Sequence, residues 1–136
     1  MIKVCCALIH ELYQGEIRLW VAQKAQFSHL AGLWEFPGGK IEPGESNTDA
    51  IIREIKEELN IAIIVESELE PVIHDYGTHC IKLFPLICHL ANPLSMPFAN
   101  EHQALALLTK QTLSKIPWAP ADKPVLKNYL ALTSQL

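Results

Sequence analysis

Three glutamates near the middle of the chain have the spacing of a metal-binding helical face. Glu54, Glu57 and Glu58 stand at positions i, i+3 and i+4. On a helix of about 3.6 residues per turn, these side chains share one side and repel one another weakly in water. A hard divalent cation such as Mg²⁺ reverses that repulsion, because it binds carboxylate oxygens and bridges them to phosphates. The alternative is a solvated acidic face on a surface helix.

The segment before these glutamates is rich in glycine. Four of the six glycines in the chain fall between residues 32 and 44, so the backbone there must adopt conformations or close contacts that a side chain would prevent. Arg53 is one of two arginines in the chain and directly precedes the acidic cluster. Its planar guanidinium can form a two-pronged pair with a carboxylate such as Glu45 and hold the loop against the helix.

Together these residues resemble the Nudix box, Gly-x5-Glu-x7-Arg-Glu-U-x-Glu-Glu-x-Gly-U, in which U is aliphatic. The matching positions are Gly39, Glu45, Arg53, Glu54, Ile55, Glu57, Glu58 and Ile61. Asn60 stands where the family has glycine, and asparagine is the next most tolerant residue for left-handed backbone geometry. We therefore expect the turn to survive this departure. A chance match over six polar or glycine positions is improbable.

The resemblance extends over most of the chain. Residues 33–40 resemble the segment that leads into the box in the MutT-type branch, and residues 100–105 and 119–124 are most similar to its CTP pyrophosphohydrolase subgroup. Residues 68–100 carry the weakest resemblance. The resemblance implies a single domain over residues 1–136 with the Nudix fold, which is an α/β/α sandwich around a mixed β-sheet.

The same resemblance implies a magnesium-dependent hydrolase, with Mn²⁺ as a substitute metal. Water would attack the β-phosphorus of a (deoxy)nucleoside triphosphate and release nucleoside monophosphate and pyrophosphate. Divalent cations neutralise phosphate charge and make water more acidic, and a nearby carboxylate can complete the proton transfer. Glu45 and Arg53 would orient the box or form a purely structural ion pair. The implied metal ligands are Glu54, Glu57, Glu58, the Gly38 carbonyl and Glu101, of which Glu101 also helps deprotonate water.

Four further residues are candidates for binding the substrate. Lys24 aligns with a basic residue that contacts phosphates in MutT-type proteins, and otherwise it is a solvated surface lysine. His29 could touch the substrate from the loop before the box. Phe36 could pack against the base or belong to the core. Asp122 stands where guanine-oxidation MutT enzymes carry asparagine; an ionised aspartate would accept from the amine of cytosine, or else cap the last helix.

The remaining pattern predicts the elements that position these residues. Apolar runs and alternation predict strands at residues 2–10, 17–22, 62–67, 72–75, 79–89 and 102–108, with a hairpin turn at Gln14-Gly15. Helices are expected at residues 46–59, 109–114 and 123–132. Pro85 should mark a bulge or a sheet edge.

Composition narrows the class of protein. The chain has 136 residues, a net charge of −4 and 49% hydrophobic residues, which is typical of one globular domain. The acidic balance argues against direct nucleic-acid binding, and no apolar run reaches the roughly 18 residues of a membrane span. We expect a cytoplasmic protein that binds a small nucleotide, as a monomer or a homodimer. The four cysteines, Cys5, Cys6, Cys80 and Cys88, are expected to be buried free thiols.

Two other functions are compatible with the motif. A Nudix hydrolase can act on another nucleoside diphosphate derivative such as ADP-ribose, although that subgroup usually has extra N-terminal structure. A Nudix module can also bind nucleotides without catalysis, but such proteins typically lose box glutamates, and here all are present. Nucleotide-pool sanitation, acting on CTP- or dCTP-type substrates or on 8-oxo-dGTP, is therefore the preferred interpretation.

Overall fold

A run of apolar residues at the start of the chain forms β1 (Ile2–Tyr13), the strand on which the sheet is built. In the computed structural model, which describes residues 1–25, 30–100, 102 and 104–133, β1 pairs in parallel with β7 (Cys80–Leu90) along one edge. Its other edge pairs antiparallel with β4 (Gly38–Lys40) near the N-terminus and with β2 (Glu16–Gln23) beyond it. The strand is therefore enclosed on both sides.

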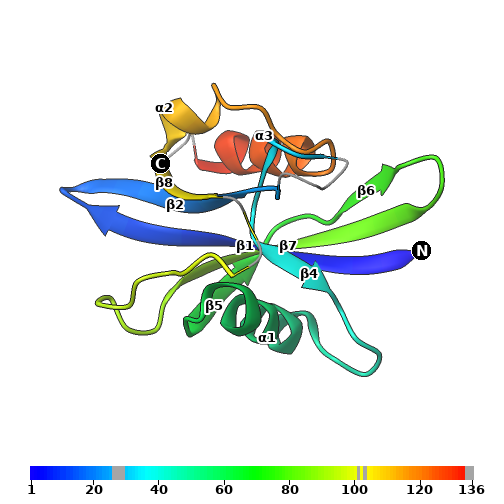
Figure 1. Cartoon of the computed structure of the whole chain (residues 1–136), viewed down its shortest axis with the longest axis horizontal. Helices are drawn as coiled ribbons and strands as arrows, with labels where there is room; N and C mark the ends of the chain where they lie inside the picture. Colours follow the sequence, from blue (N-terminus) through cyan, green and yellow to red (C-terminus); the bar gives the residue numbers. More distant parts are fainter. Residues whose placement is uncertain (26–29, 101, 103, 134–136) are drawn as a thin grey trace.

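The other strands extend the sheet outward from this centre (Figure 1). On one side β2 pairs with β3 (Trp34–Glu35) and β8 (Ala104–Thr109). On the other side β7 pairs with β5 (Ile63–Glu68) and β6 (Val72–Asp75).

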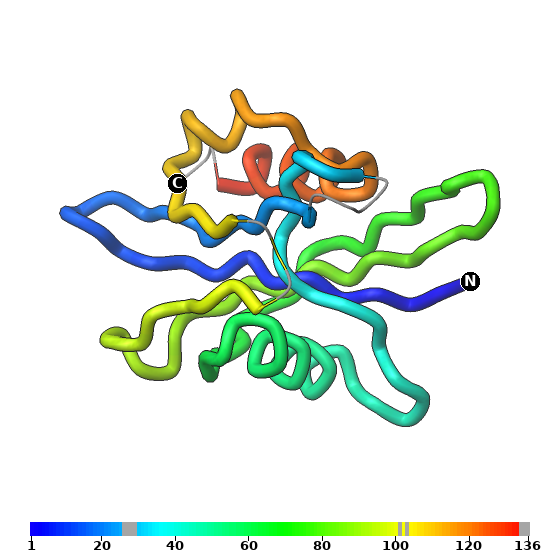
Figure 2. The backbone as a smooth tube through the Cα atoms, viewed as in Figure 1, coloured from blue at the N-terminus to red at the C-terminus, as the bar shows by residue number. Residues whose placement is uncertain are grey.

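Helices cover both faces of the sheet. The tube in Figure 2 shows α1 (Asn47–Leu59) on one face, and α2 (Lys110–Leu113) and α3 (Asp122–Thr133) on the other. Alternate side chains of β1 supply both cores: Cys6 and Leu8 pack with the α3 side, and Cys5, Ala7 and Ile9 with the α1 side. This is the α/β/α sandwich that the sequence predicts. None of the described helices is long and apolar enough to cross a membrane.

Local sequence explains where α1 begins and ends. Ser46 accepts a hydrogen bond from the Asp49 N–H at 3.0 Å, as an N-cap residue does. Ile51, Ile55 and Leu59 are fully buried along one side of the helix. Asn60 ends it in the left-handed conformation, with φ 56° and ψ 36°, so the expected turn survives the replacement of the family glycine.

Most predicted elements are present, with shifted boundaries, and one local expectation needs correction. Pro85 does not make β7 an edge strand, because Cys6 of β1 pairs with it in register. On the other edge, β5 pairs with residues 86–90 and β6 with residues 80–83. Pro85, which has no N–H, lies between these two pairings. The bulge is in β5, between Val65 and Ser67.

The short strands of the glycine-rich stretch, β3 and β4, were not predicted. Neither is long enough to show the alternation of apolar and polar residues that indicates a strand. The four cysteines are free thiols as expected; Cys80 is half-buried and the other three are buried.

The left-handed conformation of Asn60 gives a testable stability difference. Asn60→Ala should lower the free energy of unfolding by about 1 kcal/mol, because a Cβ without a compensating polar group is strained there. Asn60→Gly should be nearly neutral, since glycine adopts this conformation freely. Urea denaturation of the three proteins measures both effects. Equal losses for alanine and glycine would show that the asparagine side chain, rather than the backbone conformation, is what matters.

Candidate active site

Two glycines allow the loop before α1 to lie against its neighbours. A Cβ at Gly39 would collide with the carboxylate of Glu54, and a Cβ at Gly38 would collide with the backbone carbonyl of Cys5. The Glu54 carboxylate therefore packs directly against the backbone of β4. This contact places a glutamate of the helix beside the segment that contains the Gly38 carbonyl.

Arg53 joins the loop to the helix through its whole guanidinium group. Its Nε and one terminal nitrogen donate to the two carboxylate oxygens of Glu45, at 2.7 and 2.9 Å. The same terminal nitrogen donates to the Lys40 carbonyl at 3.0 Å. The other terminal nitrogen lies 3.0 Å from Glu54 Oε1 and 3.3 Å from Glu57 Oε2. The predicted Arg53–Glu45 pair is thus confirmed as a bidentate ion pair, and it extends to two box glutamates.

This ion pairing perturbs the titration of Glu45. Hydrogen bonds from the Arg53 side chain, with a further one from the Glu42 N–H, lower the pKa of Glu45 to about 2. The acid thus remains charged over the whole neutral range, and the loop is held against α1 by a permanent ion pair.

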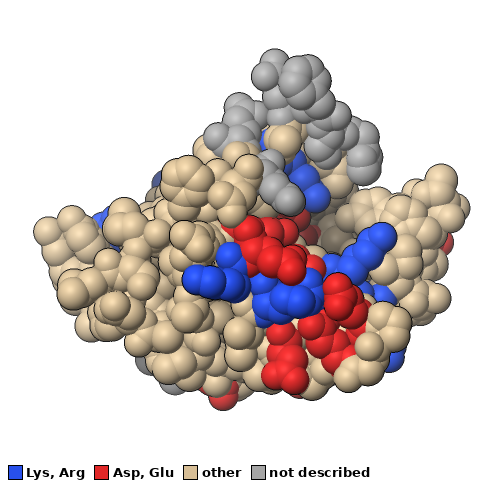
Figure 3. All heavy atoms as spheres, turned by 60° about the horizontal axis from the view of Figure 1, so that its bottom comes forward, with Lys and Arg blue, Asp and Glu red and all other residues tan. Residues whose placement is uncertain are grey.

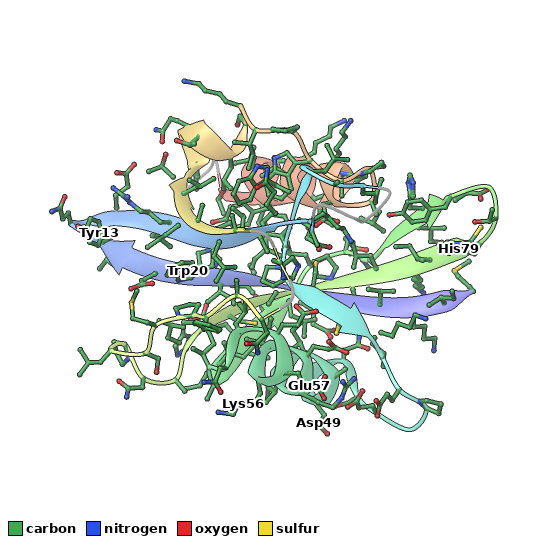
Figure 4. All side chains as sticks on the ribbon, in the orientation of Figure 1. Tyr13, Trp20, Asp49, Lys56, Glu57 and His79 are labelled. Atoms are coloured by element: carbon green, nitrogen blue, oxygen red, sulfur yellow. The ribbon has the colours of Figure 1, made fainter. Side chains whose placement is uncertain are left out.

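The acidic face of α1 differs in exposure from one residue to the next. The side chain of Glu54 is 14% exposed, whereas that of Glu57 is 61% exposed; Figure 4 labels Glu57 on the helix. The space-filling view in Figure 3 shows acidic and basic side chains gathered in one patch on this part of the molecule. Carboxylate oxygens beside a backbone carbonyl are the donor set that hard divalent cations prefer.

The predicted metal ligands do not form a preassembled cluster in the part of the chain that is described. No three histidine, cysteine or acidic side chains there are grouped so as to hold a metal. Glu54 and Glu57 are instead turned toward Arg53. Glu101, the predicted loop ligand, lies outside the described residues. The ligand set therefore stays a prediction.

A cavity of about 380 Å³ leads away from the acidic helix. Its lining includes Gly38 and, from the box, Gly39, Lys40 and Glu58, together with Phe36, Tyr76 and Asp122. Val4 and Cys6 of β1 and Ile81 and Leu83 of β7 also line it, on the side of the sheet that faces α3. Charged box residues and apolar core residues therefore line the same cavity.

Asp122 is a buried acid that lines this cavity, with 6% of its surface exposed. Its Oδ2 accepts a hydrogen bond of 2.7 Å from the Phe36 N–H. Burial raises the pKa of Asp122 to about 8, and the nearby carboxylate of Glu35 adds to the rise. The carboxyl group is therefore mostly protonated at neutral pH, which corrects the expectation of an ionised aspartate there.

The alternative role of Asp122 as a helix cap does not match the geometry. Asp122 is the first residue of α3 rather than the residue before it. Its carboxylate bonds to a backbone group 86 positions away in the sequence. A backbone connection explains this proximity: the Trp34 N–H donates to the Pro117 carbonyl and the Ala119 N–H to the Trp34 carbonyl.

Of the other three residues predicted to bind the substrate, two line the cavity and one lies outside the described residues. Lys24 lines the cavity, but its Nζ is 3.1 Å from Glu35 Oε1, so its charge is partly compensated. Phe36 also lines the cavity, yet it is only 2% exposed and packs on Trp118 with ring centroids 4.7 Å apart. His29 lies outside the described residues.

Comparison with known proteins decides the family. Residues 4–129 match the NUDIX domain family. The chain belongs to the Nudix family. Its curated relatives, among them proteins named CTP pyrophosphohydrolase and 8-oxo-dGTP diphosphatase, make it a Nudix hydrolase of the MutT type.

The relatives of this Nudix hydrolase include two curated proteins of Escherichia coli strain K12. One is named CTP pyrophosphohydrolase and is 38% identical over 132 residues, which are 97% of this chain and 93% of that protein. The other is named 8-oxo-dGTP diphosphatase and is 29% identical over 108 residues, covering 79% of this chain and 82% of that protein. The solution structure of the E. coli ORF135 protein superposes with a TM-score of 0.83, at 36% identity and over 99% of this chain and 92% of that one.

Three residues of the Nudix cavity were missed by the sequence analysis. Glu35 links Lys24 to His102, whose Nε2 lies 2.9 Å from Glu35 Oε2. His102 and Tyr76 both line the cavity. Glu35 was within the segment that resembles MutT-type proteins and so could have been singled out. His102 likewise lies in the segment 100–105 that resembles a MutT-type subgroup. Tyr76 carries no local motif, and only the pairing of strands brings it to the site.

The Arg53–Glu45 pair predicts an acid-dependent loss of stability. Because the pKa of Glu45 falls on folding, its stabilising effect is present above the ordinary value of 4.5 and is lost as the pH falls toward 2. Thermal unfolding should show Glu45→Gln to be less stable than the unmodified protein at pH 7, with the difference shrinking below pH 4. Glu70→Gln, an exposed acid elsewhere, is the control. A difference that is constant over this pH range would contradict the ion-pair account.

Proposed function

We propose that this Nudix hydrolase converts nucleoside triphosphates to nucleoside monophosphate and pyrophosphate, with Mg²⁺ as its metal and Mn²⁺ as a substitute. The observation that carries this proposal is the cavity that joins the box glutamate Glu58 to the buried acid Asp122. A triphosphate needs charge compensation at one end and a mostly apolar pocket with a polar group for its base at the other. Nucleotide-pool sanitation is the role that fits such a reaction.

The residues present fit a divalent cation. Gly39 leaves room for the Glu54 carboxylate against the backbone of β4, and the donor atoms are all oxygens, which suits Mg²⁺ better than softer metals. Glu54, Glu57, Glu58 and the Gly38 carbonyl would hold the cation, with Glu101 as a further ligand. When bound, the cation neutralises phosphate charge and favours deprotonation of the attacking water.

The chain's own residues then hold the substrate and move a proton. Arg53 pairs with Glu54 and Glu57 at 3.0 and 3.3 Å, which offsets part of the repulsion between these carboxylates before a cation binds. Lys24 and Lys40 line the cavity and can attract phosphate oxygens. Glu101 is the group proposed to accept a proton from the attacking water.

We further propose that cytosine nucleotides are preferred substrates, with 8-oxo-dGTP as a second substrate. A protonated carboxyl group has one O–H donor and retains acceptor capacity. Asp122 in this form can donate to the ring nitrogen N3 of cytosine and accept from its exocyclic amine. The relative named CTP pyrophosphohydrolase, matched over nearly the whole chain, supports this preference, and the relative named 8-oxo-dGTP diphosphatase supports the second substrate.

A nucleotide panel tests the proposed reaction. Purified protein with Mg²⁺ should release monophosphate and pyrophosphate from CTP, dCTP or 8-oxo-dGTP, and EDTA should abolish this release. ADP-ribose and dGTP complete the panel, with products separated by chromatography. Turnover of ADP-ribose alone would contradict the proposed substrate class. No turnover from protein shown to be folded would favour a module that only binds nucleotides.

Removing one box carboxylate tests the assignment of the metal ligands. Glu57→Gln should lower kcat by about a hundredfold or more, since a lost ligand weakens charge compensation in the transition state. The fold should persist, because Glu57 is largely exposed. Glu70→Gln, an exposed acid outside the site, is the matched control. Activity of Glu57→Gln close to that of the control would remove Glu57 from the metal site.

The raised pKa of Asp122 predicts a pH dependence for cytosine recognition. As the pH rises past about 8, the carboxyl group of Asp122 ionises and loses the donor for N3, so the KM for CTP should increase. Asp122→Asn keeps one donor and one acceptor at every pH, and its KM should stay flat between pH 7 and 9. Steady-state kinetics over this range compares the two proteins. Parallel profiles would show that another group causes the change.

A further inference from the structure

The hairpin between β6 and β7 projects an aromatic residue into the substrate cavity. Tyr76 follows β6 directly and lines the cavity together with Asp122, Lys24 and Glu35. Burial raises the pKa of the Tyr76 phenol, and Asp122, which is ionised at the high pH where tyrosine titrates, raises it further. This is consistent with a hydroxyl group near that acid. The ring also packs against the core on the α3 side of the sheet. Tyr76 therefore lines the cavity near Asp122.

The hairpin holds Tyr76 in one position through several contacts. The Tyr76 N–H donates to the His79 carbonyl at 2.9 Å, and the Gly77 N–H donates to Asp75 Oδ1 at 2.7 Å. The rings of Tyr76 and His79 are stacked, with centroids 5.2 Å apart, and His74 meets Tyr76 edge-on at 4.4 Å. Figure 4 shows His79 on this hairpin. A tyrosine ring held in place in this way loses little conformational freedom when a flat ligand binds.

Tyr76 is also better placed to meet a base than the aromatic residue that the sequence pointed to. Phe36 is almost fully buried, and its ring already packs on Trp118. Tyr76 is half-buried, so part of its surface remains open to the cavity it lines. Aromatic rings contact nucleobases through their faces, and every base offers such a face.

We infer that Tyr76 is a specificity-determining residue, whose ring contacts the nucleobase and limits the size of base that fits beside Asp122. This inference rests on the proposed function and names a selecting group within the same cavity. Tyr76 is one of the residues that line the cavity of about 380 Å³, so its ring takes up space that a purine, the larger base, needs more than a pyrimidine. His79 and His74 act as positioning residues because they brace that ring.

Substitutions of Tyr76 separate the role of the ring from that of the hydroxyl group. Tyr76→Phe keeps the ring, and its kcat/KM for CTP should be little changed. Tyr76→Leu keeps apolar bulk for the core but removes the ring, and it should lower kcat/KM for CTP about tenfold, mainly through KM. Because the cavity becomes larger, its kcat/KM for 8-oxo-dGTP should fall less, so the preference moves toward the purine.

Binding of a product separates failure of this inference from failure of the proposed reaction. Calorimetric titration with CMP needs no turnover, and Tyr76→Leu should bind CMP about tenfold more weakly than the unmodified protein. Tyr13→Leu is the matched control, because Tyr13 lies at the opposite end of the sheet (Figure 4) and is half-exposed. Equal CMP affinity in all variants would overturn the role of Tyr76 even if CTP is hydrolysed. An equal loss for CTP and 8-oxo-dGTP would overturn its role in selection.

Discussion

The site depends on one interaction, the contact of the Arg53 guanidinium with the glycine-rich loop and the acidic helix together. Five donor contacts reach Glu45, Lys40, Glu54 and Glu57, at 2.7 to 3.3 Å. Three glutamates on one helical face would repel one another, and the arginine offsets part of that repulsion by pairing with two of them. It also ties β4 to α1, so the segment containing Gly38 stays beside Glu54. A lysine could supply the charge but not the planar set of donors.

The rest of the fold places a cavity beside this charged centre. β1 pairs with β4 on one edge and with β7 on the other, so the loop of the box and the β6–β7 hairpin flank a common strand. The segment before α3 is attached to Trp34 by two backbone hydrogen bonds, which place Asp122 against the Phe36 N–H. Residues far apart in the sequence therefore line a single cavity, which contains both charged and apolar side chains, as the proposed binding of a nucleotide requires.

Sequence alone was sufficient for the features that local chemistry determines. The helix with its Ser46 cap, the Arg53–Glu45 pair and the left-handed Asn60 follow from neighbouring residues. Features that depend on long-range packing were less accessible. The protonated form of Asp122 results from burial among groups on other elements, and nothing in its neighbours in sequence indicates that. Tyr76 and His102 reach the cavity through strand pairing across the sheet, and Pro85 fits within β7 because the pairing partner changes beside it.

The central claim is that one cavity holds a divalent cation at the α1 glutamates and a nucleobase at Asp122. A crystal structure with Mn²⁺ and a non-hydrolysable CTP analogue tests it most directly, because anomalous scattering places the metal independently of the nucleotide. We predict the metal at Glu54, Glu57 and Glu58, with the cytosine ring next to Asp122 and Tyr76. A metal bound away from α1, or a base outside the cavity with the phosphates still on the helix, would contradict this account.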